Sequence, residues 1–303
     1  MKDRILFNGI FPALITPLNA DGTVRTQAVA PIMKWMLSQQ VNGFYVLGGT
    51  GEGAVLAERE RMRMAEAAAD VLQGTEKKLI LHVGAADSRE AQRLAAHAAS
   101  VGADAISSVY PNFFCHYTAD EAVDYYQSLI EASGLPMLCY CTPMIQGVDV
   151  VRFVEKLMKV DGVIGVKYTF PNYFHMQQIK QLNSGNINVI NGPDETLLCG
   201  LCMGADGGIG TTYNLMPDRF VRLYEAFQNG DLPAAIREQT SINRVISVVL
   251  RHGLIPSVKL GLESMGFDVG PAAFPARRYT AEQREVILRD LREAGLSGTE
   301  KEN

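Results

Sequence analysis

Short apolar segments of strand length alternate with amphipathic stretches from residue 10 to about residue 230. In the amphipathic stretches, apolar residues recur at three- and four-residue spacing, which predicts helices, for example over residues 59–72, 90–100 and 150–158. Strands that alternate with helices form parallel sheets, and eight such units close a (β/α)8 barrel. The predicted strands are residues 10–15, 43–47, 78–83, 105–109, 136–141, 163–167, 188–190 and 207–210.

The main competing arrangement is a doubly wound open sheet. Such a sheet often carries a G-x-G-x-x-G motif after its first strand, whereas Thr16-Pro17-Leu18 follows here. We therefore predict the α/β class, with a TIM barrel that carries the active site over residues 1–230. After Gly230 the alternation ends, and the remaining patterns predict helices over residues 232–250, 255–265 and 281–291, the last with Thr280 as N-cap. Residues 231–303 are expected to form a helical extension packed on the barrel.

The charge of the chain argues against two classes of partner. A formal net charge of −5 disfavours nucleic acid and anionic membranes as main partners. No apolar run approaches the roughly 20 residues of a membrane span, and the first residues do not resemble a signal peptide. We expect a cytoplasmic protein.

The cysteines and histidines show no pattern of a disulfide framework or a metal site. Five cysteines in 303 residues are too few for such a framework. Cys199 and Cys202 form a CxxC pair, but in a segment predicted to be a buried helix, so packing thiols are favoured over a redox or metal pair. The five histidines lack ligand spacing such as HxxxH, and no metal is expected.

The segment 163–169, Val-Ile-Gly-Val-Lys-Tyr-Thr, places a lysine at the end of an apolar strand. Because side chains alternate along a strand, one face is expected to carry Val163, Gly165, Lys167 and Thr169, and the other Ile164, Val166 and Tyr168. A buried position desolvates the Lys167 amine and favours its neutral form, a nucleophile towards ketones. The alternative is a lysine that extends its ammonium into solvent.

In a barrel of this kind, functional side chains lie at the carboxyl ends of the strands. Those ends carry Gly48-Gly49-Thr50-Gly51-Glu52, Tyr140, Lys167 with Thr169, Asn191-Gly192-Pro193-Asp194-Glu195, and Gly210-Thr211-Thr212. The glycine-rich turn is either a tight loop or a nest of backbone amides that, with the Thr50 hydroxyl, holds a carboxylate. Asp194 and Glu195 also suit the start of a helix, and Tyr140 could be a core tyrosine. Their convergence on one barrel mouth favours a binding site.

Together these motifs resemble the N-acetylneuraminate lyase and dihydrodipicolinate synthase family of class I aldolases. The resemblance implies that Lys167 forms a Schiff base with a 2-keto acid, that Gly49 and Thr50 hold its carboxylate, and that Tyr140 relays protons. The segment Gly207-Gly208-Ile209-Gly210-Thr211-Thr212-Tyr213-Asn214 is close to the lyases' GGIGSTYN, and residues 144–147 lack the arginine of the synthase branch. By the same resemblance, the polyhydroxyl tail of a sugar acid would be bound by Thr169, Gly192, Asp194, Glu195 and Thr211.

The sequence departs from the family pattern at three places. Gly49 stands where the lyases have a serine, and Thr211 also replaces a serine. Phe113 and Phe114 stand where the family has a tyrosine that joins the proton relay from a neighbouring subunit. The proton path would then run through water, Thr50 or Tyr110.

The resemblance predicts a carbon–carbon lyase of carbohydrate metabolism that cleaves a 2-keto-3-deoxy sugar acid, with the sialic acid N-acetylneuraminate favoured, to pyruvate and an aldehyde. No cofactor is expected, because the protonated imine is itself an electron sink. Alternatives are an aldolase for 2-keto-3-deoxy aldonic acids, a dihydrodipicolinate-synthase-like condensation, and a catalytically weak keto-acid binder. The expected partner is the small-molecule 2-keto acid, and the expected assembly is a homotetramer.

Overall fold

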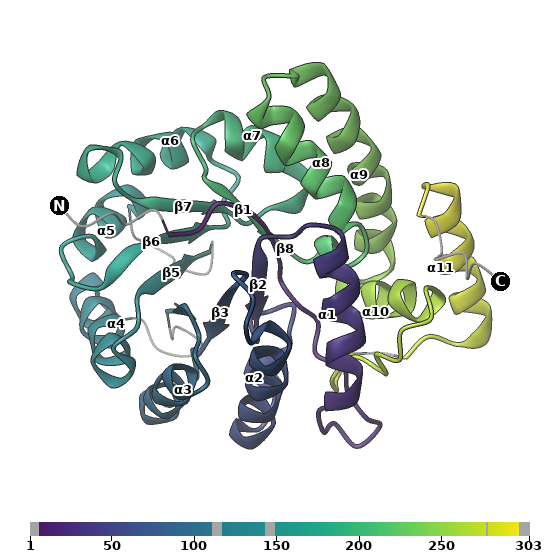
Figure 1. The fold of residues 1–303 in the computed structure, drawn as a ribbon, viewed down its shortest axis with the longest axis horizontal. Coiled ribbons are helices and arrows are strands. Elements are labelled where there is room, and N and C mark those ends of the chain that lie inside the picture. The colour runs from purple at the N-terminus through teal and green to yellow at the C-terminus, as the bar shows by residue number, and fades with distance from the viewer. Residues whose placement is uncertain (1–5, 111–116, 143–148, 277, 297–303) are drawn as a thin grey trace.

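Eight parallel strands form the centre of the molecule (Figure 1). The computed structural model describes residues 6–110, 117–142, 149–276 and 278–296 of the chain. The strands are β1 (Gly9–Pro12), β2 (Gly43–Val46), β3 (Lys78–His82), β4 (Ala105–Val109), β5 (Met137–Cys141), β6 (Val163–Tyr168), β7 (Asn188–Asn191) and β8 (Gly207–Gly210). Each pairs in parallel with its neighbour in the order β1-β8-β7-β6-β5-β4-β3-β2. The predicted TIM barrel is confirmed, and the doubly wound sheet is excluded.

Backbone bonds between β1 and β2 close the barrel. The Asn42 amide donates to the Ile10 carbonyl and the Leu14 amide donates to the Tyr45 carbonyl, both at 2.9 Å. A parallel bridge between Ala13 and Tyr45 lies between these bonds. The apolar segment predicted over residues 10–15 is therefore only in part a regular strand.

Helices surround the strands, and each strand is followed by one (Figure 1). They are α1 (Val29–Ser38), α2 (Glu58–Leu72), α3 (Ser88–Ser100), α4 (Ala119–Ser133), α5 (Val150–Leu157), α6 (Tyr173–Gln181), α7 (Leu197–Cys202) and α8 (Pro217–Gln228). Short 3-10 segments are η1 (Thr26–Ala28), η2 (Gly53–Val55), η3 (Leu182–Gly185), η4 (Asp194–Thr196) and η5 (Thr212–Asn214). Side-chain caps fix several helix starts, as where Thr118 and Glu121 form a capping box at α4.

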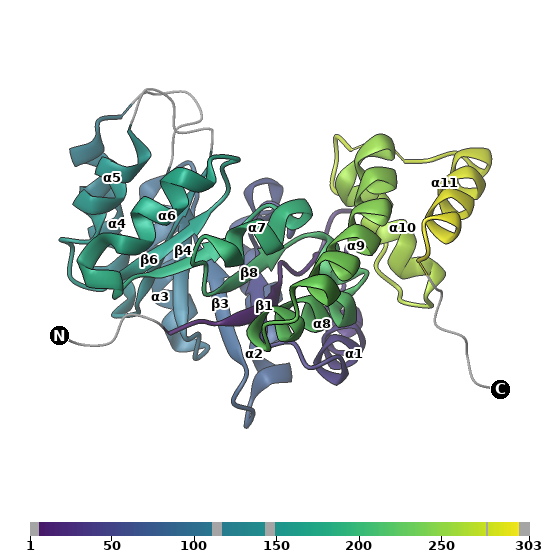
Figure 2. The same ribbon diagram turned by 90° about the horizontal axis from the view of Figure 1, so that it is seen from above.

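Three further helices follow the barrel: α9 (Leu232–His252), α10 (Leu254–Ser264) and α11 (Ala281–Glu293). Helix α9 packs along α8, and α10 and α11 lie to one side of the barrel (Figure 2). Thr280 caps α11 in a capping box with Gln283, as predicted. The division of the chain at residue 230 stays a prediction. No single helix of the described residues is long and apolar enough to cross a membrane, whereas α9 and α10, bent by 118°, pass that test as a pair by length and composition only.

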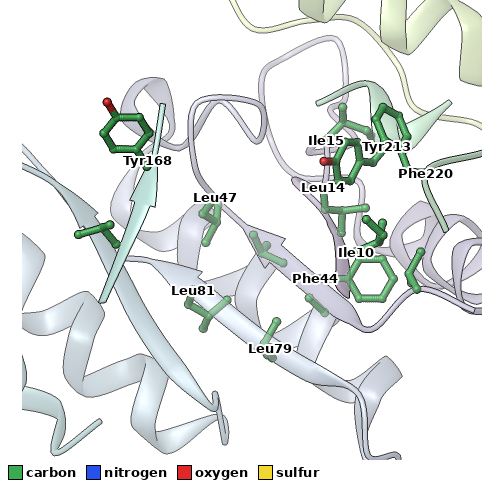
Figure 3. Packing of buried hydrophobic residues seen from close by; sticks show 14 of the residues in the cluster. Ile10, Leu14, Ile15, Phe44, Leu47, Leu79, Leu81, Tyr168, Tyr213 and Phe220 are labelled. Carbon is green, nitrogen blue, oxygen red and sulfur yellow. The ribbon is translucent and has the colours of Figure 1, made fainter. Parts of the chain in front are cut away.

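The buried apolar residues form two shells, one on each side of the barrel wall. The inner shell takes one side chain from each strand, namely Phe11, Tyr45, Ile80, Ala105, Leu138, Ile164, Ile190 and Ile209, together with Phe7 and Ala13. The outer shell packs the strands against the helices. Part of it appears in Figure 3, where the Tyr213 and Phe220 rings lie against each other at a centroid distance of 3.8 Å.

Strict alternation along β6 was wrong for its first residues. Val163 belongs to the outer shell with Val166 and Tyr168, whereas Ile164 belongs to the inner shell. The pairing of β5 with β6 shifts register there, from Met137–Val163 to Leu138–Gly165. The shift leaves one extra residue in β6, so the alternation of side chains before it is out of phase with the alternation after it. Lys167 is unaffected, because the regular register resumes before it.

The prediction that the CxxC pair lies buried was also wrong. Cys199 and Cys202 are free and exposed, while Leu197, Leu198 and Leu201 of the same helix are buried. Cys139 and Cys141 are free, buried thiols of β5. Helix α7 has only six residues, too short for its apolar face to be read from the sequence.

Candidate active site

A pocket of about 720 Å³ opens at the carboxyl ends of the strands. Its walls come from the loops after β2, β6, β7 and β8, from Tyr140 of β5, and from α9 and α10. All the residues predicted for the site line it: Gly49, Thr50, Tyr140, Lys167, Thr169, Gly192, Asp194, Glu195 and Thr211. The structure therefore brings together segments that lie far apart in the sequence.

The Lys167 side chain is buried between two aromatic rings. Lys167 is 6% exposed, and its Nζ lies 4.1 Å from the centre of the Tyr140 ring and 4.4 Å from that of Tyr45. Aromatic faces attract cations, more strongly where water is excluded. These rings would therefore stabilise the positive charge of a protonated imine formed at this nitrogen.

The buried Tyr45, whose ring contacts the Lys167 amine, was not predicted as a site residue. Its phenol lies on the inner side of β2 and donates to Ser107 Oγ at 3.1 Å. Burial raises the pKa of Tyr45 well above its usual value, so it stays a neutral phenol. Gly43–Val46 is buried throughout, and an unbroken apolar segment does not reveal which of its residues face inward.

His82 completes the group of rings. Its ring centre lies 6.5 Å from that of Tyr140 and 6.2 Å from that of Tyr45. Nε2 accepts the Val109 amide at 3.0 Å, which joins β3 to β4. Burial, with Arg61 and Lys167 nearby, lowers the pKa of His82 to about 3. The imidazole is therefore neutral in the physiological range and adds no positive charge beside Lys167.

The glycine-rich turn after β2 faces Lys167 across the pocket mouth. Within it, the amides of Glu52 and Gly53 donate to the carbonyls of Gly49 and Gly48, at 3.1 and 3.2 Å. The Thr50 hydroxyl lies 2.7 Å from the Thr211 hydroxyl after β8. That bond links the predicted carboxylate site to the predicted tail site.

Asp194 lines the pocket and also forms hydrogen bonds with the segment after β8. Its Oδ2 accepts both the amide and the hydroxyl of Thr212 at 2.6 Å. Burial raises the pKa of Asp194 to about 6, although the Thr212 bonds and Lys167 oppose the shift. One carboxylate oxygen is thus engaged within the protein, which the sequence did not indicate. Glu195 beside it is exposed, and its carbonyl accepts the Asn243 side chain at 2.9 Å.

Thr169 and Gly192 meet at the wall between β6 and β7. The Thr169 hydroxyl oxygen is buried and has no hydrogen-bond partner among the described residues. A Cβ at Gly192 would lie 1.9 Å from that oxygen, so the close approach requires glycine there. A buried hydroxyl without a partner is costly, and a polar group of a bound ligand can satisfy it.

Another part of the pocket lining is apolar and comes in part from the helices after the barrel. It consists of Phe170, Pro171, Ile246, Leu250, Leu254 and Ile255. The sequence predicted a packed extension but did not assign these residues to the site, because nothing local distinguishes them from core residues. Phe113 and Phe114 lie outside the described residues. Tyr110 does not line the pocket, and its phenol donates to the Thr118 carbonyl at 3.4 Å.

Known proteins resemble this chain over almost its whole length. Residues 6–294 match the dihydrodipicolinate synthetase family. The chain is 36% identical over 289 residues to the N-acetylneuraminate lyase of Rhizobium meliloti, which spans 94% of this chain and 93% of that protein. It is 35% identical over 259 residues to the enzyme of that name from Citrobacter koseri, spanning 85% of this chain and 86% of that protein.

Solved structures agree with this fold. The N-acetylneuraminate lyase of Proteus mirabilis superposes with a TM-score of 0.91 at 29% identity, covering 96% of this chain and 99% of that one. A Clostridium difficile protein in complex with mannosamine gives 0.90 at 29% identity, covering 95% and 99%.

Proposed function

Because the chain belongs to the dihydrodipicolinate synthetase family, we propose that it is a class I aldolase that cleaves N-acetylneuraminate to pyruvate and N-acetylmannosamine. The observation that carries the proposal is the buried Lys167 amine against the Tyr45 and Tyr140 rings, in a pocket that also carries hydroxyl and carboxylate side chains. Among the relatives and solved structures described above, those named for an activity are N-acetylneuraminate lyases.

The first step joins Lys167 to the substrate. The amine attacks the C2 ketone, and loss of water leaves a protonated imine. The two aromatic faces at about 4 Å favour that positive charge. Meanwhile, the Thr50 hydroxyl and the backbone donors of the turn hold the adjacent carboxylate, which fixes C2 against Nζ.

The second step breaks the C3–C4 bond. The Tyr140 oxygen, which gave its own proton to the water lost in the first step, accepts the proton of the C4 hydroxyl; the C3–C4 electron pair moves to form the C2–C3 double bond, and the imine nitrogen becomes neutral. The aldehyde leaves and an enamine remains. Protonation at C3 and hydrolysis then release pyruvate and restore the Lys167 amine.

The other wall of the pocket supports a long, hydroxylated substrate. Thr169, Asp194, Glu195 and Thr211 present oxygen atoms to the space beyond C4, and Ile246, Leu250 and Leu254 form an apolar surface opposite. Hydroxyl groups of the substrate tail form hydrogen bonds with the polar side chains, and the N-acetyl methyl group packs against the apolar ones. A pocket with buried polar groups discriminates strongly against substrates that leave them unpaired.

The assembly and the cellular compartment are part of the proposal. The family resemblance supports a homotetramer, and the exposed apolar side chains Phe174 of α6 and Ile236 of α9 are candidates for its interfaces. The described cysteines are free, which supports a reducing compartment such as the cytoplasm. Light scattering tests the assembly, and a monomer would contradict it.

Borohydride trapping tests the function directly. Pyruvate and borohydride are expected to add one reduced pyruvyl group per chain, located on Lys167 by peptide mass analysis. Lys167→Ala should abolish the adduct, whereas Lys34→Ala, at an exposed site on α1, should leave it unchanged. A panel of 2-keto-3-deoxy sugar acids, followed by pyruvate release, then tests the substrate. An adduct on another lysine, or faster turnover of an aldonic acid, would contradict the proposal.

A further inference from the structure

The glycine-rich turn after β2 is held from behind by the helices that follow the barrel. Glu52, the last polar residue of the turn, has a side chain only 9% exposed, and its Oε2 accepts Lys259 Nζ of α10 at 2.6 Å. Its Oε1 accepts the Ala273 amide at 2.7 Å. Both carboxylate oxygens are therefore bonded to the segment after α9, more than 200 residues along the chain.

Lys259, like Glu52, is buried and bonded to more than one group. The Lys259 side chain is 2% exposed, and its Nζ also donates to the Pro271 carbonyl at 2.8 Å. A buried charge is tolerated where it is paired and its hydrogen bonds are satisfied. The pair thus forms a single buried connection between the turn, α10 and the 271–273 segment.

The backbone of the turn requires such a connection. Leu47 and Glu52 adopt left-handed conformations, with φ of 68° and 55°, although neither is glycine. Residues of this kind persist in that region only where surrounding contacts hold them. A second bond, from Thr16 Oγ1 to the Gly51 carbonyl at 2.6 Å, fixes the other side of the turn.

We propose that Glu52 is a positioning residue for the carboxylate end of the 2-keto acid. Through Lys259 and the Ala273 amide it fixes the turn over residues 48–53, so that Thr50 and the backbone amides face the carbon next to Lys167. The inference rests on the proposed aldolase function, because it assigns the turn to the substrate carboxylate. It makes the helices after the barrel part of the substrate-binding apparatus.

A comparison of two ketones separates positioning from general stability. Pyruvate and methyl pyruvate offer Lys167 the same ketone, but only pyruvate has a carboxylate for the turn to hold. Glu52→Ala is expected to raise the pyruvate concentration for half-maximal borohydride trapping by about 10- to 100-fold, the scale seen when remote changes misplace a bound group. The value for methyl pyruvate should change by less than about twofold.

Two further variants keep the positioning role testable even if Glu52→Ala does not fold. Glu52→Gln retains the shape and an oxygen for the Ala273 amide, and is expected to give an intermediate shift. Lys259→Met removes the other partner and should resemble Glu52→Ala. The matched control is Arg284→Met, which breaks another ion pair of α10, to Glu263 at 2.8 Å, without touching the turn. It should leave both ketones unaffected.

Equal losses for pyruvate and methyl pyruvate would overturn the positioning role and leave Glu52 as a purely structural residue. An unchanged pyruvate response in folded Glu52→Gln and Lys259→Met would overturn it as well. If the unaltered protein forms no adduct on Lys167, the aldolase function itself is wrong, and the positioning role fails with it.

Discussion

Tyr140 and Lys167 are directly paired across β5 and β6, and the Lys167 Nζ lies 4.1 Å from the centre of the Tyr140 ring. The contact therefore involves the face of the ring. The face favours a cation at the nitrogen, and the hydroxyl is available for proton transfer. The two contributions can be separated, because phenylalanine keeps the face and loses the hydroxyl.

Tyr140→Phe should lower kcat by roughly 10²- to 10⁴-fold, the usual range for a general acid–base group. The pyruvate concentration for half-maximal trapping should change little, because the ring next to Lys167 remains. Steady-state kinetics measures the change in kcat, and borohydride trapping on the same preparation measures the pyruvate concentration. An unchanged kcat would show that Tyr140 only packs in the barrel.

Much of the fold could be predicted, because the barrel imposes a local pattern on the chain. All eight strands were located: β4 and β8 match their predicted bounds, five others differ by one residue at one end, and only β1 differs by more, because its buried chain continues past the regular pairing. Ile15 is an example, since its amide donates to the Asn214 side chain rather than to a neighbouring strand. The register shift at Met137–Leu138 left no sign in the sequence, and so Ile164 was assigned to the wrong face.

The site was predictable where it follows strand ends and unpredictable where it depends on distant packing. Parallel strands bring their carboxyl ends to one mouth, so Gly49, Lys167 and Asp194 could be placed together without knowing a single contact. The Glu52–Lys259 pair joins residues that share no motif. The apolar wall from α9 and α10 likewise depends on where those helices dock.

Asp194 should give the reaction a pH dependence near pH 6. Burial raises its pKa to about 6, so the side chain is a carboxylate above that pH and a neutral acid below it. A carboxylate accepts hydroxyl donors of the tail, and protonation removes part of that capacity. We expect kcat/KM for N-acetylneuraminate to fall as the pH drops through about 6, and this step should be absent in Asp194→Asn.

The same shift has a defined effect on stability. The folded pKa lies above the unfolded value of 3.8, so the native state holds the proton more tightly. This residue's contribution to the free energy of unfolding therefore decreases as the pH rises from about 4 to 6. Denaturant unfolding of the protein and of Asp194→Asn across this range measures the difference, and identical pH profiles would contradict the assignment.

Glu195 should affect the length of substrate accepted more than the chemistry. It is exposed and lines the pocket, and in the proposed function it contacts the tail of the substrate rather than the ketone. Glu195→Ala should reduce kcat/KM for N-acetylneuraminate by about tenfold, the scale of one hydrogen bond to a charged group. A short 2-keto-4-hydroxy acid should be nearly unaffected, and Glu195→Gln should lose less. Equal losses for both substrates would indicate a structural role.

Gly49 provides a test by gain of binding. It is exposed at the pocket, and a Cβ built there meets nothing within 4 Å, so a larger side chain fits without rearrangement. A serine would add one hydroxyl beside Thr50, and a hydrogen bond to a carboxylate contributes about 1.5–3 kcal/mol. Part of that is lost in ordering the side chain, so Gly49→Ser should lower the KM for pyruvate in the condensation direction by about tenfold. Gly49→Ala is the matched control, since it adds the Cβ without the hydroxyl and should leave the KM unchanged. If serine and alanine act alike, the turn does not hold the carboxylate at this position.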